Sequence, residues 1–322
     1  MNSGFVVIGR NEDYRLVECL NSIIETGCPI VYVDSGSSDN SVENARNVGA
    51  DIVELDMSTP FTAARARNAG FKRLVSENPQ LEFVHFIDGD CALEPKWLGM
   101  GANFILSHAD VAIVCGKLQE RFPEASVFNR LCQREWDRPP GETKECGGIA
   151  LVRIKAFQQA GGYRDSLIAG EEPELCVRLR EKGWRIWRLD CVMATHDAAM
   201  TRFGQWWKRA MRGGHAFAEV SLIHFGSTQG IWKIETARSV VWGLLLPLAI
   251  FSLSVVEPLS LVLFAAYPLQ IVRLARKEGW KSVDSWMFAS FLVIGKFAEA
   301  IGILKYYISL IFRTQSRAIE YK

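Results

Sequence analysis

The chain has 322 residues, of which 49% are hydrophobic, and a formal net charge of +1 at pH 7. This length allows one large domain or one domain with an appendage. Because a surface that binds nucleic acid needs a surplus of Lys and Arg, the near-neutral charge excludes nucleic acid as an expected partner.

We expect the N-terminal part of the chain to stay in the cytosol. The strand-like run Phe5-Val6-Val7-Ile8 has no basic segment, apolar segment or cleavage site of a signal peptide ahead of it. The eight cysteines contain no Cys-x-x-Cys pair and no paired histidine spacing. We therefore expect reduced cysteines that mostly pack in the interior, rather than a zinc site or a disulfide framework.

Short apolar runs alternate with segments of helical period from residue 5 to about residue 115. This alternation is typical of βαβ units and predicts an α/β fold with a mostly parallel central sheet flanked by helices. The expected strands lie near residues 5–8, 30–34, 51–55, 82–87 and 111–115. Ligands of such sheets bind at the carboxyl ends of the strands, so the residues that follow each strand are the first candidates for a site.

Acidic residues follow two of these strands. Asp34 ends the second, and Asp88 and Asp90 follow the run 83–87 with one Gly between them. The Gly lets the chain turn and bring both carboxylates toward one ligand. A divalent ion that carries a substrate diphosphate fits this arrangement, because Mg²⁺ takes one or two carboxylates and leaves its other positions to water and phosphate. Ordinary turn chemistry is the alternative.

Six short motifs occur in order along residues 5–215. They are Ile8-Gly9-Arg10-Asn11-Glu12, Val33-Asp34-Ser35-Gly36-Ser37-Ser38-Asp39, Ala66-Arg67-Asn68-Ala69-Gly70, Asp88-Gly89-Asp90, Gly147-Gly148 and Gly170-Glu171-Glu172-Pro173-Glu174-Leu175. This series resembles the family 2 glycosyltransferases of GT-A fold. The resemblance implies an inverting transferase that uses a nucleotide-diphosphate sugar, a divalent metal (Mn²⁺ or Mg²⁺) at the Asp-x-Asp element, and a carboxylate base that deprotonates an acceptor hydroxyl.

Two of the motifs depart from the family pattern. The usual Asp-Asp-Gly-Ser is Asp34-Ser35-Gly36-Ser37 here, so the motif does not specify the nucleotide. The usual Glu-Asp-x-Asp-Leu is Glu171-Glu172-Pro173-Glu174-Leu175, so the implied base is a Glu with one more methylene.

The resemblance implies roles for the residues that would perform the chemistry. Glu172 is the expected base, and a base within hydrogen-bond reach contributes about 10²–10⁴ in rate. Asp90 is the expected metal ligand and His196 a third contributor to the metal shell, with a packed, hydrogen-bonded histidine as the alternative. For the acidic cluster around Glu172, the alternative is simple complementation of a helix dipole.

Further residues are expected to bind the donor. Asp34 would contact the donor at the end of its strand. Arg67 would reach a phosphate or a base edge, with an exposed helix Arg as the alternative. Asp88 would assist through the ribose or a metal-bound water, with a satisfied loop carboxylate as the alternative. Arg209 and Arg212 lie three residues apart on a predicted helix and share a face, which suits a bidentate grip on the leaving diphosphate. A basic collar at a membrane surface is the alternative for this pair.

The acceptor side is expected at two glycines and one carboxylate. Gly147 and Gly148 would let a sugar ring approach the backbone closely, and Glu171 would orient the acceptor. Turn geometry is the alternative for the glycines.

Long apolar segments fill the C-terminal part. Residues 239–256 are uncharged, and a helix of this length reaches about 27 Å, near the thickness of a bilayer core. A shorter run, 259–272, follows Glu257-Pro258, and Lys and Arg lie on both outer flanks but not at the turn. This pattern predicts a hairpin over 239–272 with both ends cytoplasmic, and a re-entrant arrangement stays open.

Residues 285–312 are also apolar but carry a narrow polar stripe. Lys296, Glu299, Lys305 and Ser309 recur at three- and four-residue spacing. The stripe predicts an amphipathic helix that lies in the membrane interface or packs its polar face against the hairpin. A helical domain in solution is the alternative.

These observations predict a glycosyltransferase domain over 1–230 and a membrane-associated helical region over 231–322. We expect transfer of a sugar from a nucleotide-diphosphate sugar to a lipid-linked glycan acceptor at the cytoplasmic face of the inner membrane. Two other classes stay open. One is a sugar-phosphate nucleotidyltransferase, which would need a Gly-rich, basic phosphate loop at the first strand, where the sequence offers only Gly9-Arg10. The other is a membrane-tethered binding module for nucleotide sugars or glycans, which would need no catalytic base.

Overall fold

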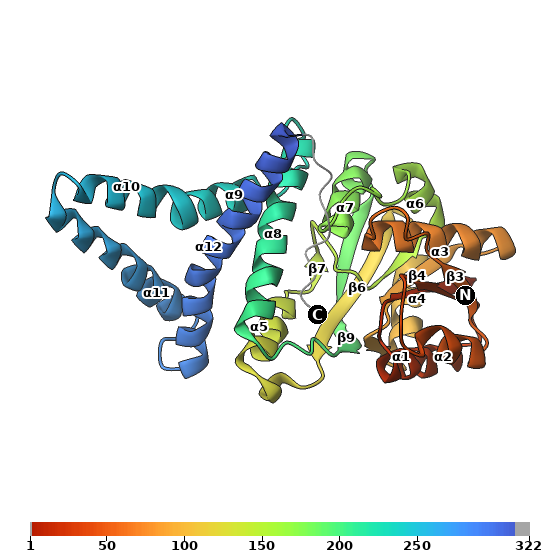
Figure 1. Cartoon of the computed structure of the whole chain (residues 1–322). Coiled ribbons are helices and arrows are strands. Elements are labelled where there is room, and N and C mark those ends of the chain that lie inside the picture. The colour runs from red at the N-terminus through yellow and green to blue at the C-terminus, as the bar shows by residue number, and fades with distance from the viewer. Residues whose placement is uncertain (1, 313–322) are drawn as a thin grey trace. The chain divides into compact units, whose positions relative to one another are not determined.

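The computed structural model describes residues 2–312 and divides into two compact units, Met1–Thr201 and Arg202–Lys322. The division lies before helix α8 (Phe203–Ile223), whereas the sequence boundary was drawn after it. The reason is packing: α8 lies along α12 (Val283–Ile311) within the second unit (Figure 1).

The first unit is built on a sheet with the strand order β3-β2-β1-β4-β8-β6-β9-β5, and β7 pairs with β9. Its first four strands in space, β3, β2, β1 and β4, are all parallel. All five strands predicted from the sequence are confirmed: β1 (Ser3–Gly9), β2 (Ile30–Asp34), β3 (Asp51–Glu54), β4 (Phe83–Asp88) and β6 (Val111–Glu120).

The other half of the sheet is mixed. Strand β8 (Ala150–Arg153) inserts antiparallel between β4 and β6. Strand β9 (Arg185–His196) is parallel to β6 and extends to His196. The short strands β5 (Cys91–Leu93) and β7 (Gly141–Glu142) pair antiparallel with β9. The prediction of parallel strands is therefore confirmed for β3, β2, β1 and β4, whereas the rest of the sheet contains both directions.

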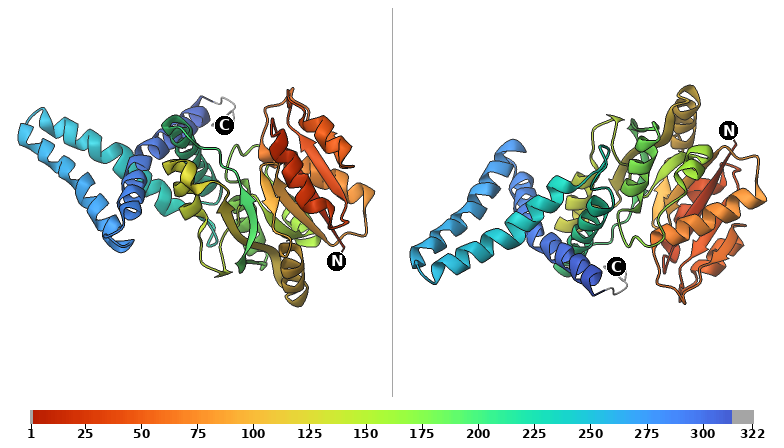
Figure 2. Two further views of the ribbon diagram at one scale, coloured as in Figure 1. Left: turned by 90° about the horizontal axis from the view of Figure 1, so that it is seen from below. Right: turned by 90° about the horizontal axis from the view of Figure 1, so that it is seen from above.

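Helices cover both faces of this sheet. Helices α1 (Tyr14–Ile24) and α2 (Ser41–Asn47) lie on one face, and α3 (Ala63–Glu77) lies on the other (Figures 1 and 2). Helix α1 buries the apolar face that its periodicity predicted. The remaining helices of the unit are α4 (Trp97–Ser107), the 3₁₀ turn η1 (Pro123–Ala125), α5 (Val127–Trp136), α6 (Ile154–Ala160) and α7 (Glu171–Glu181).

Helix α3 approaches the sheet closely because of one glycine. A Cβ at Gly70 would lie 2.5 Å from Val6 Cγ1 and 2.8 Å from Val33 Cγ2. The N-terminus of α3 is capped by Thr62, whose hydroxyl accepts a hydrogen bond from the Arg65 N–H at 3.1 Å. Together these fix the position of the motif residues that follow on α3.

The second unit contains a helical hairpin. One arm consists of α9 (Lys233–Val240), a π-helical turn η2 (Val241–Leu245) and α10 (Leu246–Ser254). The other arm consists of the 3₁₀ segment η3 (Pro258–Ala265) and α11 (Ala266–Lys277), and the two arms diverge from their common tip (Figure 2). The hydroxyl of Tyr267 donates to the carbonyl of Trp242 at 2.7 Å and so joins the arms.

Helix α12 contacts both α8 and the first arm through glycines. A Cβ at Gly302 would lie 1.9 Å from the Met211 carbonyl oxygen, and one at Gly243 would lie 2.0 Å from the Lys296 carbonyl oxygen. Such close backbone contact is typical of helices that pack in membranes. Part of the predicted polar stripe packs against the hairpin, since Glu299 pairs with Lys296 at 2.6 Å and accepts a hydrogen bond from Ser239.

All eight cysteines are free, and six of them are buried.

Candidate active site

Four motifs of the first unit meet at the buried guanidinium of Arg67 on α3. Its Nη2 lies 2.8 Å from Asp88 Oδ1 at the end of β4. Its Nη1 lies 2.7 Å from Glu171 Oε1 and 3.0 Å from Glu172 Oε1 at the start of α7. The site therefore contains three carboxylates and one guanidinium, where the sequence had predicted a phosphate or base contact for Arg67.

The fourth motif supplies space for this cluster. A Cβ at Gly148 would lie 2.6 Å from Arg67 Nη2 and 3.0 Å from both Asp88 Oδ2 and Glu172 Oε1. Gly147, in contrast, has no heavy atom within 4 Å of such a Cβ. Of the two glycines, Gly148 is thus the one that the carboxylate cluster requires.

The surroundings of Glu172 change its acidity. Its pKa is raised to about 7, first by burial and then by the Glu171 carboxylate, against the opposing effect of Arg67. Burial by itself lowers the pKa of Arg67, but the carboxylates of Asp88, Glu172 and Glu171 outweigh it and raise that pKa. A carboxyl with a pKa near 7 exchanges its proton near neutral pH, as a general base must.

The three carboxylates differ in exposure. The side chains of Glu171, Glu172 and Asp88 are 5%, 14% and 36% exposed. Glu171 is thus largely enclosed, and its expected role toward an acceptor stays a prediction. Glu172 and Asp88 keep enough surface to meet a bound substrate.

Glu174, the third acid of the α7 motif, has a different surrounding. It is fully buried and pairs with Arg164 Nε at 2.5 Å and Arg178 Nη2 at 2.6 Å. These pairs anchor the first turn of α7, so Glu174 supports the helix on which Glu171 and Glu172 stand.

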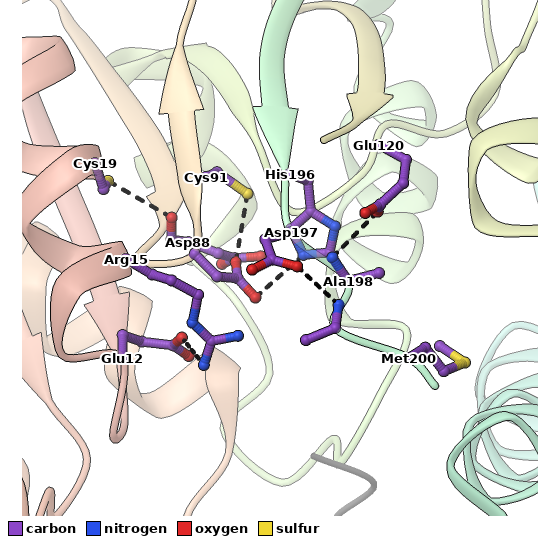
Figure 3. A network of polar contacts seen from close by, with 12 residues as sticks. Glu12, Arg15, Cys19, Asp88, Cys91, Glu120, His196, Asp197, Ala198 and Met200 are labelled. Carbon is purple, nitrogen blue, oxygen red and sulfur yellow. Dashed lines mark hydrogen bonds and ion pairs between the residues drawn. The ribbon is translucent and has the colours of Figure 1, made fainter. Parts of the chain in front are cut away.

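A second group of polar residues lies where β4 and β9 end. The register of β5 with β9 pairs Cys91 with His196, and the Asp197 N–H donates to the Asp90 carbonyl at 3.1 Å. Asp90 Oδ2 lies 3.1 Å from His196 Nε2, and the Cys91 thiol lies 3.4 Å from Asp90 Oδ1. Figure 3 shows Cys91 and His196 side by side, with Asp88 near them.

The donor set of this group fits a divalent cation. Ligand atoms of Asp90, Cys91 and His196 all lie within 4.8 Å of one another. Two ligands at about 2.1 Å from one ion, at a right angle, are about 3.0 Å apart, close to the observed 3.1 Å between Asp90 and His196. Hard ions such as Mn²⁺ and Mg²⁺ prefer oxygen ligands to sulfur, so we expect Asp90 and His196, rather than the Cys91 thiol, to hold the ion.

Asp34 holds the loop that follows β2. Its Oδ2 accepts the N–H groups of Gly36 and Ser37, each at 2.9 Å, and its Oδ1 accepts the Tyr32 hydroxyl at 3.1 Å. Gly36 has φ +80°, which this loop geometry requires. The buried carboxylate thus shapes the loop, and direct contact with a donor stays a prediction.

Arg209 and Arg212 lie on α8 in the second unit, partly exposed. Their predicted contact with a leaving diphosphate remains a prediction.

Two aromatic residues of the site were missed by sequence reasoning. The Tyr163 ring lies 5.8 Å from the Arg67 guanidinium carbon, and the Trp136 ring packs edgewise on His196 with 4.8 Å between ring centroids. Tyr163 follows Gly161-Gly162, a turn signal that marked only the end of a helix. Trp136 ends α5 and belongs to no motif, so only the fold reveals it.

Changing Gly148 to Ala should lower the sugar transfer that the family resemblance implies by up to about 10²-fold, because the added methyl group must displace Arg67 or Glu172 by a distance that matters for catalysis. Gly147→Ala is the matched control, since its methyl group would meet no neighbour. Transfer rates of the two purified variants provide the measurement. Equal rates for both variants would contradict the placement of Gly148 within the cluster.

One family model and several known proteins resemble this chain in sequence. A family model described as Glycosyl transferase family 2 matches residues 5–170. A pre-mycofactocin glycosyltransferase of Mycobacterium tuberculosis is 28% identical over 214 residues, which cover 62% of this chain and 43% of that protein. The succinoglycan biosynthesis protein ExoA of Rhizobium meliloti is 27% identical over 187 residues, which cover 54% of this chain and 56% of that protein. The chain thus spans about half the length of these relatives.

Solved structures share the fold. A mannosyltransferase, PcManGT from Pyrobaculum calidifontis in complex with GDP-Man and Mn²⁺, superposes with a TM-score of 0.65 at 16% identity, over 94% of this chain and 87% of that chain. S. aureus TarS 1–349 gives a TM-score of 0.50 at 16% identity, over 97% and 92% of the two chains. The predicted GT-A type α/β fold is confirmed. Because the family model covers more than half of its residues, this chain belongs to glycosyl transferase family 2.

Proposed function

We propose that the protein is a metal-dependent, inverting glycosyltransferase that moves a sugar from a nucleotide-diphosphate sugar to a hydroxyl group of a lipid-linked glycan at the cytoplasmic face of the inner membrane. The observation that carries the proposal is Glu172, a partly exposed carboxyl with a pKa of about 7 beside Arg67. Two relatives support the class of reaction by their names, a glycosyltransferase and a succinoglycan biosynthesis protein.

Glu172 acts as the general base in this proposal. Its carboxylate takes the proton of the acceptor hydroxyl while the hydroxyl oxygen bonds to the anomeric carbon of the donor sugar. The bond from that carbon to the diphosphate oxygen breaks, and its electron pair leaves with the nucleoside diphosphate. One displacement from the opposite face inverts the anomeric centre, and Glu172 then releases its proton to water.

Arg67 positions the base. It holds one carboxylate oxygen of Glu172 at 3.0 Å and that of Asp88 at 2.8 Å, so both groups keep fixed orientations. Three carboxylates around one guanidinium leave an excess of negative charge, which favours uptake of a proton by the cluster. Asp88 is the most exposed member and is placed to accept a hydrogen bond from the donor.

The residues Asp90 and His196 would hold the divalent ion. When bound, Mn²⁺ or Mg²⁺ supplies a Lewis acid that stabilises the negative charge of the leaving diphosphate. The structural neighbour PcManGT was solved with GDP-Man and Mn²⁺, which supports a nucleotide-sugar donor and a divalent ion.

Three helices support membrane association. Lys233–Ser254, Pro258–Lys277 and Val283–Ile311 are each long and apolar enough to cross a membrane. Both arms of the hairpin carry exposed apolar side chains, including Leu248 and Phe251. We propose that the hairpin enters the bilayer and that residues 231–322 form the membrane-associated region, with the transferase in residues 1–230.

The third apolar helix is proposed to lie in the interface rather than to form a third span. Helix α12 begins directly after the second arm ends, and its Phe297 ring stacks on Tyr267 with 5.5 Å between centroids. Its Lys296 backbone packs on Gly243 of the first arm. Helix α12 thus contacts both arms of the hairpin, which suits a helix that packs its polar face against them.

The full-length chain should remain in the membrane fraction after a wash with alkaline carbonate and enter solution only with detergent. Leu248→Glu combined with Phe251→Glu should move most of the protein into the soluble fraction. A charged side chain costs up to about 3 kcal/mol at the centre of the bilayer, and less nearer its surface. Tyr14→Glu, at an exposed aromatic residue of α1, is the control and should stay bound. A wild-type chain found in the soluble fraction would contradict the proposal.

The donor class can be tested with the purified chain in detergent. UDP-, GDP- and dTDP-sugars, each with Mn²⁺ or Mg²⁺, are added and both the melting temperature and release of nucleoside diphosphate are followed. We expect one class of donor to raise the melting temperature and to release its nucleoside diphosphate slowly. Release of pyrophosphate from a nucleoside triphosphate and a sugar phosphate would indicate a nucleotidyltransferase instead, and stabilisation without any release would indicate a binding module.

A further inference from the structure

The four residues that follow His196 have no regular secondary structure. Residues 197–200 lie outside any strand or helix, and Ala199 has φ +46°, an unfavourable value for an alanine. The Asp197 side chain supports this bend by accepting the Ala199 N–H at 3.0 Å. The conformation of the segment decides how the chain leaves His196, and groups on two other elements hold it.

Glu120, at the end of β6, supports the middle of the segment. Its Oε2 accepts the Ala198 N–H at 3.1 Å, as Figure 3 shows. Its Oε1 accepts the Phe122 N–H and the Asn129 amide, both at 3.1 Å. All three groups are N–H donors, so the buried carboxylate is satisfied by this segment and its neighbours.

Helix α5 supports the end of the segment. Asn129 Oδ1 accepts the Met200 N–H at 3.1 Å, and the Ser126 hydroxyl donates to the Met200 carbonyl. Seven residues further along the same helix, Trp136 packs edgewise on the His196 ring. One helix therefore contacts both the imidazole of His196 and the chain that follows it.

We infer that Glu120 and Asn129 are positioning residues. They fix the conformation of the segment after His196, and this conformation directs the His196 imidazole toward Asp90. In this way they set the affinity of the site for the metal ion. This inference rests on the proposed metal-dependent function. In this inference neither residue is itself a ligand of the ion, and both act through the segment that follows His196. Groups that orient metal ligands in this way typically change metal affinity by about 10- to 100-fold when they are removed.

A Mn²⁺ titration of the purified full-length protein tests the inference. The free Mn²⁺ signal is followed by electron paramagnetic resonance, without donor or acceptor. Asn129→Ala and Glu120→Gln should each weaken Mn²⁺ binding by about 10-fold or more. The Gln variant keeps the volume but turns an amide N–H toward N–H donors, so it cannot replace the carboxylate.

Asn68→Ala is the matched control. Asn68 likewise makes hydrogen bonds with a loop backbone, to Tyr163 O at 2.8 Å and from Tyr163 N at 3.0 Å, but at the Arg67 side of the site. A general loss of stability should be similar in the two Asn variants, whereas only Asn129→Ala should lose Mn²⁺ affinity. Ser126→Ala removes one bond to the segment and the N-cap of α5 but keeps the bond between Asn129 and Glu120, so it provides a milder variant with an expected loss of a few-fold.

His196→Ala separates the two proposals. Unchanged Mn²⁺ binding in this variant would overturn the proposed metal site itself. Weakened binding in His196→Ala together with wild-type binding in folded Glu120→Gln and Ser126→Ala would overturn the positioning role alone. Equal losses in Asn68→Ala and Asn129→Ala would also overturn it, because the effect would then reflect stability.

Discussion

Replacing Glu172 with Gln should lower the rate of sugar transfer by about 10²- to 10⁴-fold, while donor affinity stays within a few-fold. The amide keeps the shape of the side chain and one oxygen for Arg67 but cannot take the acceptor proton. Single-turnover transfer and donor binding without acceptor separate the two effects.

Two controls accompany this substitution. Glu181→Gln, at the exposed end of α7, should transfer at the wild-type rate. Because the pKa of Glu172 is about 7 and the base form is the ionised one, the wild-type rate should rise with pH and level off above pH 7, and Glu172→Gln should lose this rise. A Glu172 variant as fast as the wild type, beside an inactive Glu171→Gln, would assign the base to Glu171.

Replacing Asp90 with Ala should lower metal-dependent turnover by about 10³-fold or more, since a bound ion stabilises the transition state by several kcal/mol. His196 alone cannot hold a hard cation that prefers carboxylate oxygen. Turnover measured across a series of Mn²⁺ concentrations provides the test, with the melting temperature as a check on folding.

Cys91→Ala is the matched control for Asp90→Ala. Its thiol lies 3.4 Å from the same carboxylate, but sulfur is a poor ligand for a hard ion such as Mn²⁺ or Mg²⁺. Its turnover should stay within a few-fold of the wild type. An Asp90 variant that turns over donor normally at limiting Mn²⁺ would place the ion elsewhere.

The strands and the site of this protein could be predicted from local patterns to different degrees. Apolar runs marked all five predicted strands, because a buried strand needs apolar residues wherever it lies. The direction of β8 could not be predicted, since an antiparallel strand and a parallel one have the same composition when both are buried. The domain boundary predicted after residue 230 was based on the apolar run that begins at residue 239. The structure instead groups α8 with α12 in the second unit, through backbone contacts at Gly214 and Gly302.

The partners of Arg67 were equally hidden from the sequence. Asp88, Glu171 and Glu172 lie 21 residues or more from it along the chain, and only the sheet brings them together. The motif showed that an arginine belongs at this position but not that carboxylates would surround it. Glu120 and Asn129 belong to none of the motifs, because a residue that supports a backbone segment needs no fixed spacing from the residue that it positions.

In the π-helical turn of the hairpin, a proline that lacks an amide hydrogen leads to a hydrogen bond between the two arms. The Leu246 N–H donates to the Val241 carbonyl, five residues earlier, so in this register the Trp242 carbonyl would need the N–H of residue 247. That residue is a proline and has none. The Tyr267 hydroxyl of the opposite arm supplies the donor. Where no water is present, an unpaired carbonyl costs several kcal/mol. Separating the arms of an inserted hairpin at Trp242 would therefore carry that cost, because the Tyr267 hydroxyl would leave this carbonyl without a donor.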